Sequence, residues 1–205
     1  MEQVAIKLPA KQHPKTELGQ QILEGCQRKD RLCQKKLYEF YYGKMMAVCM
    51  RYTGNYEEAR DVLHEAFMKV FQNIERFTPA SSLESWVKRI VINTAIDHFR
   101  KNKHRQNQLE IDEAITLPDA NSMQVLSQIS ADEIMQLVQQ LSPSYRTVFN
   151  LYVIEGYTHR EIAGLLQVSE GTSKSNLAKA RHLLQQMIFK LLPEYRNLYH
   201  NEDET

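Results

Sequence analysis

Apolar residues recur along much of the chain at the three- and four-residue spacing of amphipathic helices. This spacing predicts helices over residues 16–27, 30–52, 56–74 and 83–105, and the last of these is apolar over much of its circumference. Few segments show the alternating β-branched residues that strands favour. The sequence therefore predicts an all-α fold.

The periodic pattern lapses between two stretches of helix. Residues 106–130 are polar and acidic, contain Pro118 and show little periodicity, which favours a flexible linker. We therefore expect two small helical domains joined by that linker. The predicted order is a loose N-terminal arm at 1–15, a first domain at 16–105, the linker at 106–130, a second domain at 131–192 and an acidic tail at 193–205.

Residues 141–184 carry the start and stop signals of three short helices. A Ser-Pro pair begins the first, and Gly156 is the residue type that ends it. Thr158 and Glu161 form a capping box that starts the second helix, and Ser169 caps the third. Two helices joined by a tight turn, the second one polar and basic outside, are typical of a helix-turn-helix.

The last helix of this motif carries polar and basic side chains that bond phosphates or base edges in a major groove. Ala163 is small enough for a close helix crossing, whereas Gln167 stands where Gly is favoured and costs about 1 kcal/mol if it is left-handed. A hairpin packed inside a bundle is the alternative, but the coincident signals favour DNA binding. The groups expected to face outward are Thr172, Lys174, Ser175, Asn176 and Lys179.

Lysine and arginine number 26 against 25 aspartate and glutamate, for a net charge of +1. A protein that binds DNA without a partner is usually more basic, so we expect something else to supply part of the affinity for DNA. The positive charge gathers within residues 88–105, close to Trp86 and a polar loop at 75–82. Aromatic surfaces beside a cationic ridge suit a single nucleic-acid strand.

The predicted helix over residues 56–74 has an acidic face that includes Glu57, Asp61 and Glu65. Such a face is either a solvated surface or a docking surface for a basic partner, and the pattern alone leaves both open.

Other classes of function find little support in the sequence. It has no phosphate-binding loop, no paired metal ligands and no nucleophile with a base, so we expect no enzyme, no catalytic residue, no metal, no cofactor and no small-molecule substrate. Three cysteines fit a reducing interior. Without a membrane-length apolar run or a signal-peptide pattern, the protein is expected to be cytoplasmic and not inserted in a membrane.

Three stretches together resemble a known family. They read DVLHEAFMKVFQNIERF, SLESWVKRIVINTAIDHFRK and LSPSYRTVFNLYVIEGYTHREIAGLLQVSEGTSKSNLAKAR. The chain resembles a bacterial RNA polymerase sigma factor, and more narrowly the extracytoplasmic-function (ECF) group of the sigma-70 family. Val62, His64, Gln167 and Ser173 depart from residues common in that family.

The resemblance implies a sigma factor that binds core RNA polymerase, recognises the −35 and −10 promoter elements and opens the DNA strands. It also implies an anti-sigma partner for many members. The alternative is a conventional helix-turn-helix regulator that binds duplex operators without joining the polymerase.

The resemblance also assigns residues to these roles. Polymerase docking falls to Asp61, His64, Glu65 and Phe67. The single-stranded −10 element falls to Phe77, Ser81, Ser82, Leu83, Trp86, Lys88, Arg89, Asn93, Arg100, Lys101 and Lys103. The duplex −35 element falls to Arg160, Thr172, Lys174, Ser175, Asn176 and Lys179.

Overall fold

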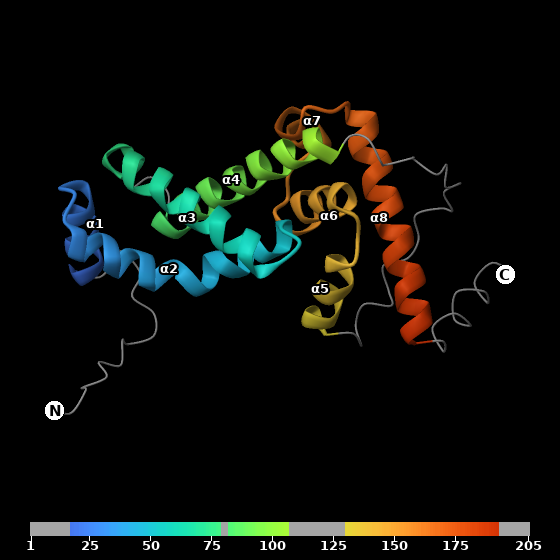
Figure 1. Ribbon diagram of the computed structural model, residues 1–205, viewed down its shortest axis with the longest axis horizontal. Helices are drawn as coiled ribbons and strands as arrows, with labels where there is room; N and C mark the ends of the chain where they lie inside the picture. Colours follow the sequence, from blue (N-terminus) through green and yellow to red (C-terminus); the bar gives the residue numbers. More distant parts are fainter. Residues whose placement is uncertain (1–16, 79–81, 107–129, 193–205) are drawn as a thin grey trace, which may run out of the picture. The chain divides into compact units, whose positions relative to one another are not determined.

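The computed structural model describes residues 17–78, 82–106 and 130–192. Every regular element in these ranges is helical (Figure 1), as the periodicity predicts. None of these helices is long and apolar enough to cross a membrane. The predicted arm and tail, and the linker apart from its two end residues, lie outside the described ranges.

Two helices of the first group begin at local side-chain caps. Asp30 Oδ1 accepts a hydrogen bond of 2.8 Å from the amide of Cys33 at the start of the second helix. Asn55 Oδ1 accepts one of 2.9 Å from the amide of Glu58 at the start of the third. The group comprises α1 (Glu17–Gln27), α2 (Arg31–Tyr52), α3 (Tyr56–Asn73), the 3-10 helix η1 (Ile74–Arg76) and α4 (Leu83–Gln106).

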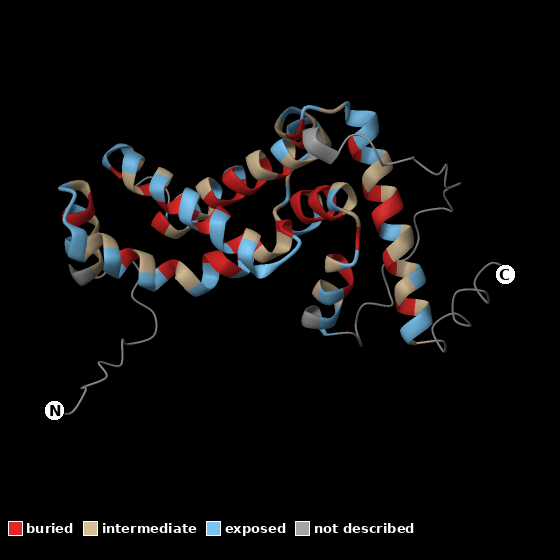
Figure 2. Ribbon diagram, viewed as in Figure 1, coloured by how far each residue is buried: buried red, intermediate tan, exposed pale blue. Residues whose placement is uncertain are grey.

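The core of this group is built from the apolar stripes that the sequence predicts. Figure 2 shows the buried faces of these helices in red. Tyr38 of α2 meets Phe67 of α3 edge to face, with ring centroids 4.7 Å apart. The buried side chains include Leu37, Tyr41 and Met45 of α2, Val62, Leu63, Ala66 and Val70 of α3, and Val87 and Val91 of α4.

The second group of helices surrounds the long helix α8. It comprises α5 (Ala131–Gln139), α6 (Pro143–Phe149), the π-helix η3 (Asn150–Ile154), α7 (His159–Leu166) and α8 (Glu170–Leu191). Helix α8 packs against α6, α7 and α5. The buried apolar side chains include Leu137, Val148, Leu151, Ile162, Leu166, Leu177, Ala180, Leu184 and Ile188.

Candidate nucleic-acid interface

The helix-turn-helix forms where its capping signals predict. Thr158 and Glu161 make both bonds of a capping box at the start of α7. These bonds, first to the Thr158 amide and then to its hydroxyl, lower the pKa of the Glu161 carboxyl. Ser169 Oγ accepts a hydrogen bond of 2.9 Å from the amide of Thr172 at the start of α8. The local sequence therefore sets the first residue of each helix in the motif.

The entry to the motif differs from expectation in two details. Ser142 occupies the N-cap position of α6, but its side chain makes no capping hydrogen bond, so Pro143 alone supplies the start signal. The expected single helix up to Gly156 consists of α6 followed by the π-helix η3. Gly156 ends it with φ of 78°, the left-handed conformation that the sequence predicts there.

Gln167 forms the tight turn between α7 and α8 in the left-handed conformation. Its φ and ψ are 56° and 48°, and its amide donates to the carbonyl of Ala163. The next amide, that of Val168, donates to the same carbonyl over 3.1 Å. The turn geometry thus requires a left-handed residue, and the chain meets that requirement with a strained glutamine in place of glycine.

The first turns of α8 present most of the side chains expected to face DNA. Thr172 and Lys174 are exposed, and Ser175 and Asn176 are half-buried. Arg160, near the start of α7, is also exposed. Amide, hydroxyl and ammonium groups on one helix end match the donors and acceptors of phosphates and base edges.

Lys179 does not belong to this outer face, so the prediction for its side chain was wrong. It is only 8% exposed, because α6 packs against α8 at this turn. Its ammonium group lies 6.0 Å from the centre of the Tyr145 ring. The long aliphatic stem is buried along apolar surface while the charged end lies over an aromatic face.

A polar contact joins α7 to α8, and the sequence reasoning missed it. Ser173 is fully buried, and its hydroxyl lies 2.9 Å from Nδ1 of His159. The imidazole stacks on Tyr152, with ring centroids 4.5 Å apart and planes 23° apart. Desolvation, followed by the charges of Lys174 and Arg181, lowers the pKa of His159. The signal in the sequence was a serine at a site where an apolar residue is common.

Helix α4 carries the polar and cationic side chains expected to meet a single strand. Asn93, Arg89 and Lys101 are exposed, while Lys88 and Arg100 are half-buried. Nζ and guanidinium groups that reach solvent from one helix can follow a phosphate backbone. The side chain of Lys103 lies outside the described residues.

The loop before α4 presents fewer side chains than the sequence suggested. Phe77 and Leu83 are 8% and 2% exposed, so these two predicted contacts are core residues. The Phe77 ring lies 5.5 Å from that of the half-buried Trp86. Ser82 is exposed, and its hydroxyl caps α4 by accepting a hydrogen bond of 3.1 Å from the amide of Ser85. Ser81 lies outside the described residues.

The acidic face of α3 is exposed as predicted. Asp61, His64 and Glu65 all reach solvent, and Glu65 pairs with Lys69 at 2.9 Å. Phe67 is only 2% exposed and packs against Tyr38 and Phe71, and the Tyr38 ring also lies 6.2 Å from that of His64. The Phe67 side chain therefore belongs to the core, and its contribution to a docking surface stays a prediction.

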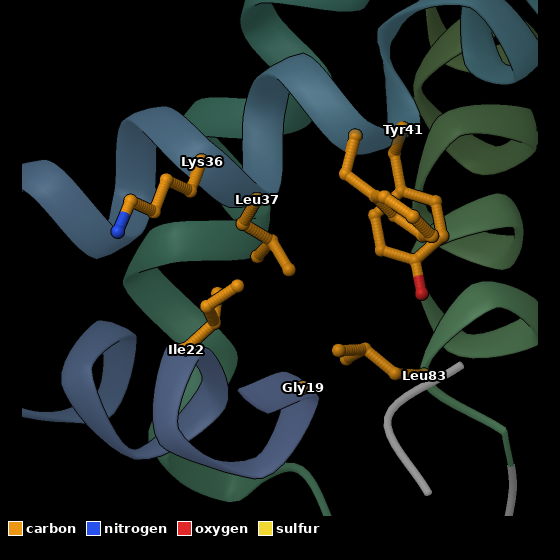
Figure 3. Close-up of a pocket in the computed structure, with 7 residues that line it drawn as sticks. Gly19, Ile22, Lys36, Leu37, Tyr41 and Leu83 are labelled. Carbon is orange, nitrogen blue, oxygen red and sulfur yellow. The ribbon is translucent and has the colours of Figure 1, made fainter. Parts of the chain in front are cut away.

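A small hollow opens between α1, α2 and the start of α4 (Figure 3). Ile22, Leu37 and Leu83 line it with Tyr41, whose pKa is raised to about 12 by burial and then by Glu84. Apart from the Tyr41 phenol and Lys36, the side chains that line this hollow are apolar. Across the described ranges, no cluster of His, Cys, Asp and Glu could hold a metal ion.

Comparison with known proteins gives the same domain order as the structure. The Sigma-70 region 2 family model matches residues 37–105, and the Sigma-70, region 4 model matches residues 131–184. The RNA polymerase sigma-H factor of Pseudomonas aeruginosa is 30% identical over 192 residues, which cover 87% of this chain and 97% of that protein.

A second relative and one solved structure extend this comparison. The ECF RNA polymerase sigma factor SigW of Bacillus subtilis is 29% identical over 167 residues, covering 74% of this chain and 87% of that one. The sigma factor RpoE from Bartonella quintana was solved in complex with the anti-sigma factor NepR. It is 20% identical with a TM-score of 0.45, and the match covers 75% of this chain and 95% of that one. From the two family models and the near-complete alignment with the sigma-H factor, the chain belongs to the sigma-70 family of bacterial RNA polymerase sigma factors, in its extracytoplasmic-function group.

Proposed function

We propose that this chain binds core RNA polymerase in the cytoplasm, directs it to promoters through their −35 and −10 elements, and opens the DNA strands for initiation. The observation that carries the proposal is the pairing, in one chain, of a sigma-70 region 2 domain with a region 4 domain. In this role the chain is a specificity subunit, and it needs no catalytic group of its own.

We propose that the exposed face of α3 docks on the polymerase. The carboxylates of Asp61 and Glu65 support this role, because they favour a basic partner, and His64 lies on the same exposed face. Buried Phe67 supports the face from within through its packing on Tyr38. The contact would form around the charged groups and not around an exposed aromatic ring.

The single-stranded −10 element would lie along α4. Asn93 offers an amide that can pair with the edge of an extruded base, and Arg89 and Lys101 offer charge to the phosphates. Trp86 is half-buried against Phe77, which leaves part of its ring for stacking. Ser82, Lys88 and Arg100 would flank the same path, while Phe77 and Leu83 lie in the core.

The duplex −35 element would meet the exposed start of α8. Thr172, Lys174, Ser175 and Asn176 are placed on the first two turns, where a helix end can enter the major groove. Arg160 on α7 is suited to a flanking phosphate. The buried Lys179 would act through its packing on Tyr145 and not by touching a base.

The net charge of +1 fits a protein that binds DNA as part of a larger assembly, which supplies part of the affinity. An isolated DNA-binding protein gains most of its affinity from phosphate neutralisation. Here polymerase would supply most of that affinity, and the chain would supply sequence discrimination. An anti-sigma factor that covers these surfaces is part of the same proposal.

The test is run-off transcription with purified bacterial core polymerase, with and without this chain, on promoter fragments from its own genome. Transcripts that start at one site and depend on the chain support the proposal and supply the promoter sequence. If core polymerase does not bind the chain, the proposal fails. A conventional regulator would instead bind its duplex site without core polymerase, and it would leave the exposed Asn93 and Arg89 of α4 without a role.

A further inference from the structure

A buried hydroxyl lies inside the helix that the proposed function assigns to the −35 element. Ser173 is fully buried, although its neighbours Thr172 and Lys174 on α8 are exposed. A polar side chain in such a place needs a hydrogen-bond partner, because burial removes its contact with water. An apolar side chain would fill the same position without that requirement.

His159 supplies the partner from α7. Its Nδ1 lies 2.9 Å from the Ser173 hydroxyl, within the range of a strong hydrogen bond. The other side of the imidazole is held by the Tyr152 ring, stacked at 4.5 Å with planes 23° apart. The Arg181 guanidinium lies 5.8 Å from the centre of that tyrosine ring.

These contacts form one chain from the π-helix through α7 to α8. Tyr152 holds the imidazole by its flat face, so the ring has little freedom to rotate while it bonds Ser173. A hydrogen bond is directional, whereas an apolar contact allows two surfaces to slide. The contact would therefore restrain the spacing of α7 and α8 and the rotation of α8 about its axis, in addition to the apolar packing between these helices.

The position of this contact links it to the DNA-facing groups. His159 precedes Arg160 in α7, and Ser173 lies between Thr172 and Lys174 in α8. A small rotation of α8 at Ser173 would turn its neighbours away from the groove floor. We infer that His159 is a positioning residue for −35 recognition, which acts through its hydrogen bond to buried Ser173 and its stacking on Tyr152. This inference rests on the proposed function.

The two parts of the contact can be removed separately. His159→Phe keeps an aromatic ring for Tyr152 and removes the nitrogen that bonds Ser173. Ser173→Ala removes the hydroxyl with the smallest change in volume. The double variant removes both partners, and it leaves neither a buried hydroxyl nor a ring nitrogen without its bond.

The experiment uses holoenzyme assembled from core polymerase and the full chain. We would measure its affinity for a labelled −35 duplex and, separately, for a fork carrying only the −10 element, with both sequences taken from the promoter that the run-off test identifies. Gln186→Ala is the matched control, because it also removes a hydrogen bond to a histidine on α8, the 2.9 Å contact with His182. Thermal melts at the assay pH establish that each variant is folded.

Each single variant should weaken −35 duplex binding about three- to tenfold, which is the range of one lost hydrogen bond. Binding to the −10 fork and to core polymerase should stay unchanged, because these contacts lie in other elements. The double variant should bind about as well as the weaker single variant, since the two residues act through one contact. Gln186→Ala should bind both DNAs like the unaltered chain.

Three results would overturn the inference. In the first, the single variants bind the −35 duplex with normal affinity. In the second, the fold-losses in affinity of the two single variants multiply in the double variant. In the third, affinity for the −35 duplex and for the −10 fork falls equally. The last pattern would mean a general loss of folded protein. If holoenzyme with the unaltered chain binds neither DNA more tightly than DNA of unrelated sequence, the proposed function itself fails. That outcome is separate from the other three.

Discussion

Replacing Gln167 by glycine should stabilise the second group of helices. Gln167 has φ of 56° and ψ of 48°, and left-handed backbone costs a residue with a Cβ roughly 1–2 kcal/mol. Glycine removes this strain but gains about 0.5–1 kcal/mol of backbone freedom in the unfolded chain. Because the Gln167 side chain is exposed, little packing is lost. The net gain in the free energy of unfolding should be about 0.5–1 kcal/mol.

The assay should report on α6–α8 alone, because the chain also contains the first group of helices, which the substitution does not touch. Native-state hydrogen exchange on peptides from these helices measures their opening free energy directly. A gain of 0.5–1 kcal/mol slows exchange through global opening by about two- to fivefold. Peptides from α2 and α3 provide the internal reference.

Gln167→Ala is the matched control. It removes the same side chain but keeps a Cβ in left-handed backbone, so exchange should stay the same or become faster. If glycine and alanine slow exchange equally, the side chain and not the backbone sets the cost. If glycine gives no protection at all, the strain argument for this turn is wrong.

Four further outcomes follow from named contacts. Lys174→Glu should weaken binding of the −35 duplex and lower the slope of log affinity against log salt by about one, as measured by titration at several salt concentrations. Asn93→Ala should slow strand opening, followed by permanganate footprinting, and leave affinity for core polymerase unchanged. Phe67→Ala should cost about 3–5 kcal/mol of stability in urea unfolding, because the ring is 2% exposed. The pKa of Glu161 is lowered by its bonds to Thr158, so the stability it contributes is present above pH 4.5 and is lost as pH falls through the lowered value; Glu161→Gln should flatten this part of a pH series of melts.

Capping chemistry made the helix starts predictable from the sequence. Thr158, Glu161 and Ser169 act within one turn of their own positions, so their role depends on local geometry and not on the rest of the fold. The left-handed turn at Gln167 is likewise local, because only three residues separate the end of α7 at Leu166 from the start of α8 at Glu170. Periodicity identified the buried faces of α2, α3 and α4 for the same reason, since one helix turn brings each stripe to one side.

The exposure of individual side chains could not be predicted in this way. Phe67, Phe77 and Leu83 lie in stretches that resemble functional motifs, yet all three are buried. A motif contains core residues and contact residues together. Whether a given side chain is buried or exposed depends on which neighbouring helix packs against it. Lys179 shows the same limit, because its burial depends on Tyr145, which is distant in sequence. The π-helix over Asn150–Ile154 has no local signal that separates it from α-helix.

Two residues that depart from the family pattern in the helix-turn-helix illustrate different physical solutions. At Gln167 the backbone requirement is local, so the chain tolerates strain at one residue without any partner having to change. At Ser173 the requirement belongs to the core, so the buried hydroxyl needs His159 fourteen residues away, and the imidazole in turn lies against Tyr152. Strain at one turn can be relieved by a single substitution. The polar contact can be replaced without loss of folding stability only if both partners change together, because changing either residue alone leaves the other without its hydrogen bond. The side of α8 that we propose faces DNA therefore depends on the residue at position 159 as well as on the sequence of α8 itself.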